Sequence, residues 1–79
     1  MSQKLRQNRT LGESLWYLRK EAGLTQNQVV AKLQLQGLNI SRSIYAQMEC
    51  GTYNIRISEL DALVKLYHTD YNTLFMFEP

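Results

Sequence analysis

Residues 22–51, AGLTQNQVVAKLQLQGLNISRSIYAQMECG, are the part of this 79-residue sequence that decides its fold. Apolar residues recur there at the three- and four-residue spacing of amphipathic helices. Thr25 with Gln28 forms a capping box before the first helix, and Ser41 is of a residue type that caps a second. The stretch therefore predicts two short helices joined by a connection, over 26–36 and 42–50.

Three glycines mark where helices are expected to end. Gly23, Gly37 and Gly51 are spaced fourteen residues apart, and each follows a helical pattern. Glycine adopts the left-handed backbone conformation that closes a helix more readily than other residues. A period of fourteen residues is too short for a solenoid repeat, so the spacing reflects helix lengths.

Three further helices are predicted over 11–22, 59–68 and 71–77. Their start signals are the pairs Thr10 with Glu13 and Ser58 with Asp61, and the single cap Asp70. No strand pattern of useful length appears, so the predicted class is all-α with five helices. The apolar stripes expected to form the core are Leu11, Leu15 and Leu18; Val29, Val30 and Leu33; Leu60, Leu63, Val64 and Tyr67; with Ile40, Leu74 and Phe75 closing it.

The net charge of +2 is unevenly distributed. Residues 1–10 carry three basic residues and no acid, whereas the rest carry six basic and seven acidic residues. We therefore expect a flexible basic arm over 1–9, or simply a solvated tail, ahead of one domain over 10–79. Because the domain is not strongly basic, any binding of nucleic acid must depend on local placement of charge.

Composition disfavours several classes of protein. No apolar run approaches the ~18 residues that span a membrane, and no signal-peptide pattern is seen, so a cytoplasmic protein without membrane contact is expected. The single cysteine, Cys50, forms no internal disulfide. His68, the only histidine, has no companions at ligand spacing, so no metal and no cofactor are predicted. No catalytic arrangement is evident, and an enzyme is not expected.

The second central helix, 42–50, has two distinct faces. At ~100° per residue, one arc carries short polar or basic side chains and the opposite arc is apolar. Arginine and glutamine can bond the base edges of guanine and adenine bidentately, and alanine can meet a thymine methyl. The candidate base-reading residues are Arg42, Ser43, Ala46 and Gln47. The alternative is an ordinary solvated helix face.

The start of the first central helix is a second candidate contact. Its unpaired backbone N–H groups and positive dipole end attract anions. Gln26 lies in the first turn and could bind a DNA phosphate. The simpler interpretation is that Thr25 and Gln28 only cap the helix, and both interpretations can hold.

These motifs resemble the phage-repressor helix-turn-helix family (Cro/cI-type, also called XRE). The resemblance is carried by Arg19, GLTQ at 23–26, the SRSxYxxxExG pattern at 41–51 and TDYNTLF at 69–75, and it extends over 11–75. It implies a five-helix lambda-repressor-like domain that binds double-stranded DNA as a small transcriptional regulator, with the helix over 42–50 in the major groove.

The resemblance also implies roles for individual residues. Arg19 and Glu49 match a partly buried ion pair that ties two helices together. Gln26 matches a phosphate-binding glutamine, and the loop 52–56 matches a second phosphate contact. The residues expected at the DNA backbone are Thr25, Gln26, Ser41, Thr52, Tyr53, Asn54 and Arg56.

The chain departs from the family pattern around the helix connection. QLQGLNIS at 34–41 is about three residues longer than the shortest family form, which predicts a first central helix longer by about one turn. Val30 stands where the family usually has alanine. These departures, with the weakly basic domain, bear on docking angle and affinity more than on the fold.

Several aromatic residues fall outside these roles. They either pack under the C-terminal tail or form a surface for a homodimer or another protein. The residues concerned are Trp16, Tyr17, Tyr71, Met76 and Phe77. Two functions follow: a dimeric regulator bound to a pseudo-palindromic operator, or an interaction module, such as an antitoxin or anti-regulator, with the same fold.

Overall fold

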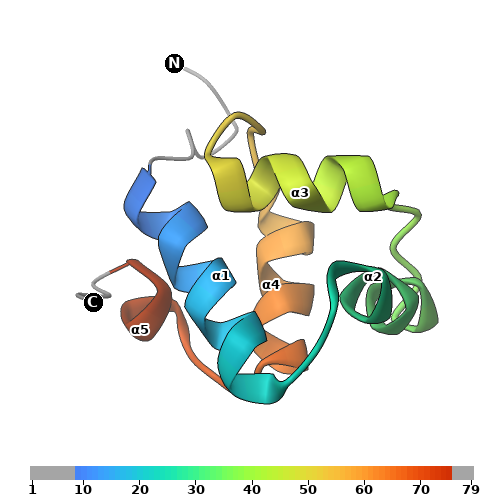
Figure 1. Cartoon of the computed structure of the whole chain (residues 1–79), viewed down its shortest axis with the longest axis horizontal. Coiled ribbons are helices and arrows are strands. Elements are labelled where there is room, and N and C mark those ends of the chain that lie inside the picture. Colours follow the sequence, from blue (N-terminus) through green and yellow to red (C-terminus); the bar gives the residue numbers. More distant parts are fainter. Residues whose placement is uncertain (1–8, 76–79) are drawn as a thin grey trace.

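The computed structural model describes residues 9–75, and they form five α-helices joined by short connections (Figure 1). The helices are α1 (Arg9–Ala22), α2 (Gln26–Leu35), α3 (Arg42–Cys50), α4 (Ile57–Leu66) and α5 (Tyr71–Phe75). No strand occurs within these residues, which confirms the predicted all-α class. None of the five described helices is long and apolar enough to cross a membrane.

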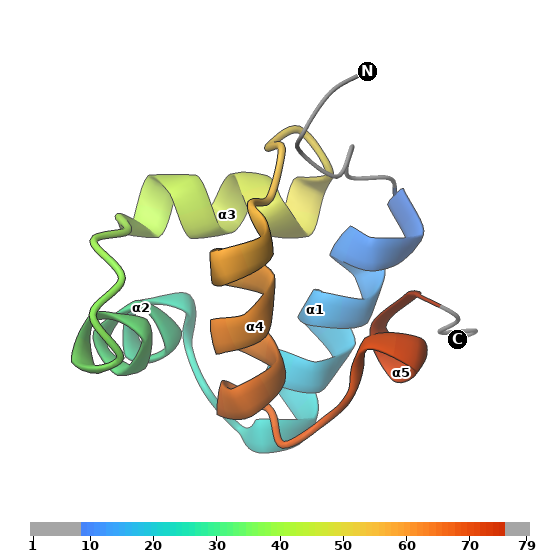
Figure 2. The ribbon, with the colours of Figure 1, turned by 180° about the vertical axis from the view of Figure 1, so that it is seen from behind.

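Helix α3 lies across one end of the molecule, and the other helices are arranged beneath it (Figures 1 and 2). It contacts both α1 and α2, while α2 also packs on α4 and the short α5 packs on α1. The outer side of α3 is therefore left without a covering helix. This arrangement presents one helix at the surface and uses the others to support it.

The start signals of three helices are as predicted. The Thr25 hydroxyl accepts the Gln28 N–H at 3.1 Å, and the Gln28 side chain accepts the Thr25 N–H at 2.8 Å. Ser41 accepts the Ile44 N–H at 3.1 Å, and α3 has the predicted bounds. Asp70 accepts the Thr73 N–H at 2.7 Å. Because side-chain caps act over three residues, these starts were readable from local sequence.

Two predicted starts are wrong. Thr10 does not cap α1, because it already has helical backbone within the helix. Arg9, which the sequence assigns to the basic arm, is helical as well. Residues 1–8 of that arm lie outside the described part. Helix α4 begins at Ile57, two residues before the prediction, and Ser58 lies inside it. A side chain of the helix itself caps its start: the Glu59 carboxylate accepts the Arg56 N–H at 2.8 Å.

The ends of α1 to α4 share one geometry. Gly23, Gly37 and Gly51 all have positive φ, as predicted, and the residue after each donates back to the carbonyl five residues earlier. Helix α4 closes in the same way, although its left-handed residue is His68 (φ 53°), with Thr69 donating to the Val64 carbonyl at 3.0 Å. His68 was predicted to be helical, so the prediction of this end is wrong.

Helix α2 ends at Leu35, one residue before the prediction, and a longer connection follows it. Two side-chain amides brace that connection: Gln34 donates to the Ile40 carbonyl at 3.3 Å, and Gln36 donates to the Ala62 carbonyl of α4 at 3.0 Å. Helix α5 was predicted to reach Phe77, but residues 76–79 lie outside the described part.

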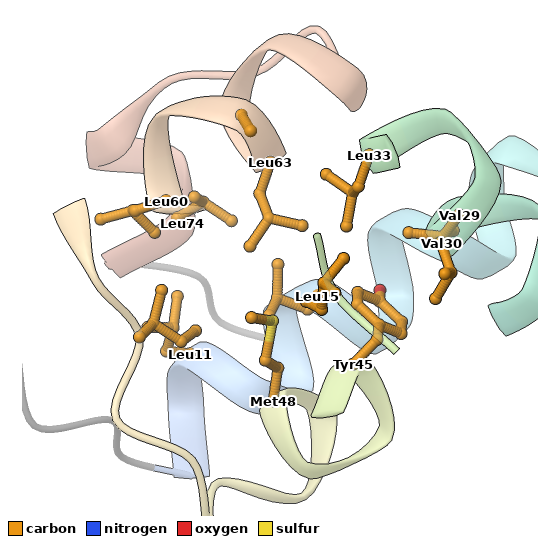
Figure 3. Close-up of a cluster of buried hydrophobic side chains, with 13 residues drawn as sticks. Leu11, Leu15, Val29, Val30, Leu33, Tyr45, Met48, Leu60, Leu63 and Leu74 are labelled. Atoms are coloured by element: carbon orange, nitrogen blue, oxygen red, sulfur yellow. The ribbon is translucent and has the colours of Figure 1, made fainter. Parts of the chain in front are cut away.

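The core lies between α1, α3, α4 and the inner side of α2 (Figure 3). Most predicted stripe residues are buried, with Leu18, Val64 and Tyr67 partly buried against them. Phe75 was expected to close the core but is 41% exposed, because Leu74 fills that position and Phe75 lies on the outer side of a one-turn helix. The completely or nearly completely buried apolar residues are Leu11, Leu15, Val29, Val30, Leu33, Ile40, Tyr45, Met48, Ile55, Leu60, Ala62, Leu63 and Leu74.

Candidate nucleic-acid interface

The two faces of α3 are separated as the helical spacing predicts. Tyr45 and Met48 are fully buried against the core, and Ile44 packs partly against it. On the opposite side, the candidate base-reading side chains Arg42, Ser43 and Gln47 are exposed. The fourth candidate, Ala46, is half-buried. The exposed face thus offers one guanidinium, one amide and one hydroxyl, and it carries no acidic side chain.

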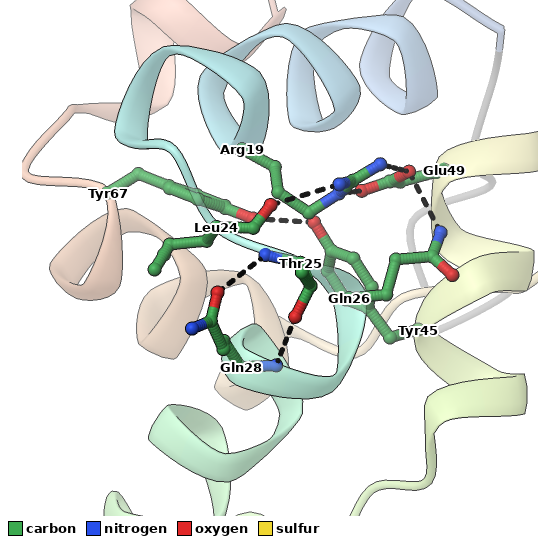
Figure 4. A network of polar contacts seen from close by, with 8 residues as sticks. All are labelled: Arg19, Leu24, Thr25, Gln26, Gln28, Tyr45, Glu49 and Tyr67. Atoms are coloured by element: carbon green, nitrogen blue, oxygen red, sulfur yellow. Dashed lines mark hydrogen bonds and ion pairs between the residues drawn. The ribbon is translucent and has the colours of Figure 1, made fainter.

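The acidic residue of α3, Glu49, is turned toward α1 and neutralised there (Figure 4). Its carboxylate accepts the Arg19 Nε–H at 2.6 Å and the Nη2–H at 3.1 Å. The side chains of the two residues are 9% and 5% exposed. The structure thus contains the ion pair that the family resemblance implies.

Arg19 is held by three acceptors. Besides both Glu49 oxygens, it donates from Nη1 to the Leu24 carbonyl at 3.1 Å. The hydrogen bond to Glu49 raises the pKa of Arg19, and this effect outweighs burial, which lowers it. The guanidinium therefore joins the end of α1 to the start of α2 and to α3, and it remains charged.

Gln26 extends this network to the start of α2. Its side-chain Nε2–H donates to Glu49 Oε1 at 3.1 Å, so one carboxylate oxygen serves both Arg19 and Gln26. The sequence did not indicate this contact, because the two residues are 23 positions apart. The backbone N–H groups of Gln26 and Asn27 lie in the first turn of α2, where the helix itself offers no carbonyl to accept their hydrogen bonds.

A surface hollow of about 490 Å³ lies beside this network, where α1 ends and α2 and α3 begin. Lys20 and Arg42 contribute positive charge to it. Lys20 was not among the predicted contact residues, although it directly follows Arg19. The residues that line the hollow are Arg19, Lys20, Leu24, Thr25, Gln26, Asn27 and Arg42.

Two tyrosines connect α3 to the residue that follows α4. The hydroxyl groups of Tyr45 and Tyr67 are 2.6 Å apart. Burial raises the pKa of Tyr67 to about 12, and it raises the pKa of Tyr45 further. Tyr67 was predicted only as an apolar stripe residue, so this polar contact across the core was missed.

The loop after α3 holds the remaining predicted backbone residues. Thr52, Asn54 and Arg56 are exposed. Tyr53 is half-buried, packs against the core and donates its hydroxyl to Glu59 at 2.9 Å. Burial is the main reason that the pKa of Tyr53 is raised. The exposed members of the loop are thus carried beside the C-terminal end of α3.

The aromatic residues outside this interface lie on α1 and α5. Trp16 and Tyr17 are exposed and in edge-to-face contact, with ring centroids 4.8 Å apart. Lys20 Nζ lies 5.4 Å from the centre of the Trp16 ring. Tyr71, also exposed, donates to Asp61 at 3.2 Å. The predicted Met76 and Phe77 lie outside the described residues. The large aromatic side chains exposed on α1 and α5 are Trp16, Tyr17, Tyr71 and Phe75.

Metal ligands do not gather in residues 9–75: no three histidine, cysteine, aspartate or glutamate side chains lie close enough to hold an ion. Cys50 is exposed at the end of α3. Exposed polar and charged side chains that can form hydrogen bonds lie on α3 and around the hollow at the start of α2.

Comparison with known proteins addresses the family. Residues 10–74 match the model of a helix-turn-helix domain. None of the curated protein sequences compared with the chain matches it. Among solved structures, a point mutant of the restriction–modification controller protein C.Esp1396I is similar, with a TM-score of 0.68 and 20% sequence identity. The likeness covers 86% of this chain and 80% of that one, and at this identity it shows the fold.

The family match covers most of the chain and contains all five described helices except the first residue of α1 and the last residue of α5. It confirms the resemblance that rested on GLTQ and on the pattern at 41–51. The chain therefore belongs to the helix-turn-helix domain family.

Proposed function

We propose that this chain binds double-stranded DNA in a sequence-specific manner, with α3 in the major groove. The observation that carries the proposal is the exposed, acid-free face of α3, which lies next to the N-terminus of α2 in a helix-turn-helix domain. In such domains the second helix enters the major groove while the first meets the backbone. The core behind α3 would hold it rigidly in that position.

Base recognition is assigned to the exposed face. Arg42 can donate two hydrogen bonds to guanine, and Gln47 can pair with adenine, each worth roughly 1–3 kcal/mol of discrimination. Ser43 can bond either a base or a phosphate, and Ala46 is suited to a thymine methyl. These roles follow from side-chain type and exposure on one helix face.

Backbone contacts are assigned to both sides of α3. On one side, Gln26, Thr25 and the free N–H groups of the first turn of α2 would bind a phosphate beside the hollow. Ser41 lies at the start of α3. On the other side, the loop after α3 would reach a second phosphate, with Thr52, Tyr53, Asn54 and Arg56 as the contact residues. Such contacts orient the domain and carry no sequence information themselves.

The biological role we propose is that of a small transcriptional regulator, a repressor in the simplest case, acting as a dimer. The similar solved structure is that of a restriction–modification controller protein, and this supports a regulatory role. Two copies would read a pseudo-palindrome with half-sites about one DNA turn apart, roughly 34 Å. The exposed aromatic residues of α1 and α5 supply apolar area for the contact between copies.

In vitro selection of DNA sites from a random pool tests the proposal. We expect an enriched motif with two related half-sites, and affinity that falls steeply with salt. Enrichment of no sequence at low salt would contradict it. Sedimentation of the protein with the selected site would then show whether two copies bind.

A second function is favoured by one specific observation. Four large aromatic side chains, Trp16, Tyr17, Tyr71 and Phe75, are each about 40% exposed on α1 and α5. A protein-interaction module would use this surface and need not read DNA. If the protein selects no DNA sequence but binds a partner that the substitution Trp16→Ala releases, this second function holds in place of the first.

A further inference from the structure

We infer that Glu49 is a positioning residue for DNA binding: it holds the Gln26 side chain in the orientation that binds a backbone phosphate. The inference rests on the proposed function and deepens it. It differs from the structural role of the ion pair, because it assigns Glu49 an effect on affinity that is transmitted through Gln26.

The geometry of the carboxylate supports this role. Oε2 of Glu49 accepts the Arg19 Nε–H at 2.6 Å, and Oε1 accepts both the Arg19 Nη2–H and the Gln26 Nε2–H at 3.1 Å. Arg19 donates a hydrogen bond to each of the two oxygens. These two bonds hold the carboxylate in the orientation in which Oε1 meets Gln26. Because a carboxylate only accepts hydrogen bonds, the Gln26 nitrogen, and not its carbonyl oxygen, must face it.

This contact fixes the remainder of the amide. A primary amide has two N–H donors, and Glu49 takes one of them. Gln26 lines the hollow together with Lys20 and Arg42, so we expect its second N–H to be available to an anion drawn there by their charge. The amide is thus oriented before any DNA arrives, although Gln26 itself is only half-buried.

Preorientation should strengthen binding because of entropy. A free glutamine side chain loses up to roughly 2 kcal/mol of rotamer entropy when it is immobilised. In this protein the Gln26 side chain loses that rotamer entropy during folding. Binding of a phosphate then requires no further loss, so affinity is higher. The ion pair would therefore contribute to DNA affinity without touching DNA.

Side-chain relaxation by NMR tests the first step on the unmodified free protein. Gln34 and Gln36 donate to backbone carbonyls and serve as ordered standards. Gln47 is exposed on α3 and serves as the mobile standard. We expect the Nε2 order parameter of Gln26 to match the ordered pair. A value as low as that of Gln47 would overturn the inference.

A double-mutant cycle tests the second step. Gln26→Ala is measured in the wild type and in the variant Arg19→Met/Glu49→Leu, which replaces the buried ion pair by apolar side chains of similar length. We expect Gln26→Ala to weaken binding to the selected site about tenfold in the wild type but about twofold in the paired variant. Circular dichroism and urea unfolding check that the paired variant folds; if it does not, the order parameter decides.

The outcomes separate the two proposals. Equal effects of Gln26→Ala in both backgrounds, or no effect in the wild type, would overturn the role of Glu49 while leaving DNA binding intact. If the wild type selects no DNA site, the proposed function fails and the positioning role fails with it.

Discussion

Gly12 of α1 passes directly against the backbone carbonyl of Glu49 in α3. A Cβ atom placed on Gly12 would clash with that oxygen, and it would lie 3.1 Å from the carbonyl oxygen of Met48. No L-residue with a side chain fits this crossing unless the backbone moves. The absence of a side chain at position 12 therefore lets α1, which bears Arg19, approach α3 closely, and the Arg19–Glu49 contact is made across the same pair of helices.

Gly12→Ala should destabilise the domain. Alanine gains about 1 kcal/mol of helix propensity over glycine. The obstacle, however, is rigid backbone and not a flexible side chain, and overpacking of this kind costs about 1–3 kcal/mol. We expect a net loss in the free energy of unfolding measured with urea, together with a weaker Arg19–Glu49 contact.

Gly23→Ala is a useful comparison, because a Cβ there meets open space but requires a left-handed backbone (φ 71°). Its cost of about 1 kcal/mol should come from backbone strain alone. If Gly12→Ala raised stability instead, the tight helix crossing would be disproved.

His68→Gly should stabilise the protein. His68 closes α4 in the left-handed conformation that the glycines occupy at the ends of α1, α2 and α3. That conformation costs a side-chain-bearing residue about 1–2 kcal/mol. We expect a gain of about 1 kcal/mol in thermal or urea unfolding. His68→Ala removes the imidazole but keeps a Cβ, so it should give no such gain; equal stabilisation by both variants would show that the ring is responsible.

Arg19→Ala should damage folding more than sequence selection. It leaves the buried Glu49 carboxylate without its cation, and breaking one side of a buried pair costs about 3–5 kcal/mol. Lys65→Ala provides the control, because Lys65 and Asp61 form an exposed pair at 3.1 Å that should contribute less than about 1 kcal/mol. Similar losses in the free energy of unfolding for both substitutions would mean that the buried pair contributes no more to stability than the exposed one.

How far local sequence determines this fold is seen best in α3. Its bounds and its two faces were predicted correctly, because Ser41, the apolar spacing and Gly51 all act within a few residues. The same logic failed at α4, where the start is stabilised by Glu59 within the helix and not by the serine at 58. It failed again at His68, since nothing in a histidine predicts a left-handed backbone.

The features of the candidate site also fall into two groups: those that local sequence predicts and those that depend on contacts between helices. The exposure of Arg42, Ser43 and Gln47 follows from position on one amphipathic helix. The bond from Gln26 to Glu49 and the hydroxyl contact between Tyr45 and Tyr67 join residues 23 and 22 positions apart. Such contacts depend on how helices cross, and no periodicity within one helix reports that.

Stability should fall at alkaline pH through the buried tyrosines. Burial raises the pKa of folded Tyr67 to about 12. An unfolded tyrosine has a pKa of about 10. The stabilisation is fully present below pH 10 and is lost as the pH rises toward 12, because the unfolded chain releases its proton first. Absorbance at 295 nm should show Tyr45 and Tyr67 ionising together with loss of helix by circular dichroism. Ionisation of every tyrosine near pH 10 with helix intact would contradict this.

Substitutions on the two parts of the interface should have different effects on DNA binding. Gln47→Ala removes a base-edge donor and acceptor from α3, so it should relax selection at one position of the site by roughly 1–3 kcal/mol. Arg56→Ala removes a charge from the loop after α3, so it should weaken all DNA sequences about equally and reduce the salt dependence by about one counterion.

Selection experiments with each variant, and titrations over a range of salt, distinguish these effects. Lys65→Ala controls for lost positive charge away from the interface, since it lies on the exposed side of α4. An unchanged motif with Gln47→Ala would remove that residue from base recognition. A changed motif with Arg56→Ala would move Arg56 from the phosphate backbone to the bases, because a phosphate contact alone cannot alter which sequence is preferred.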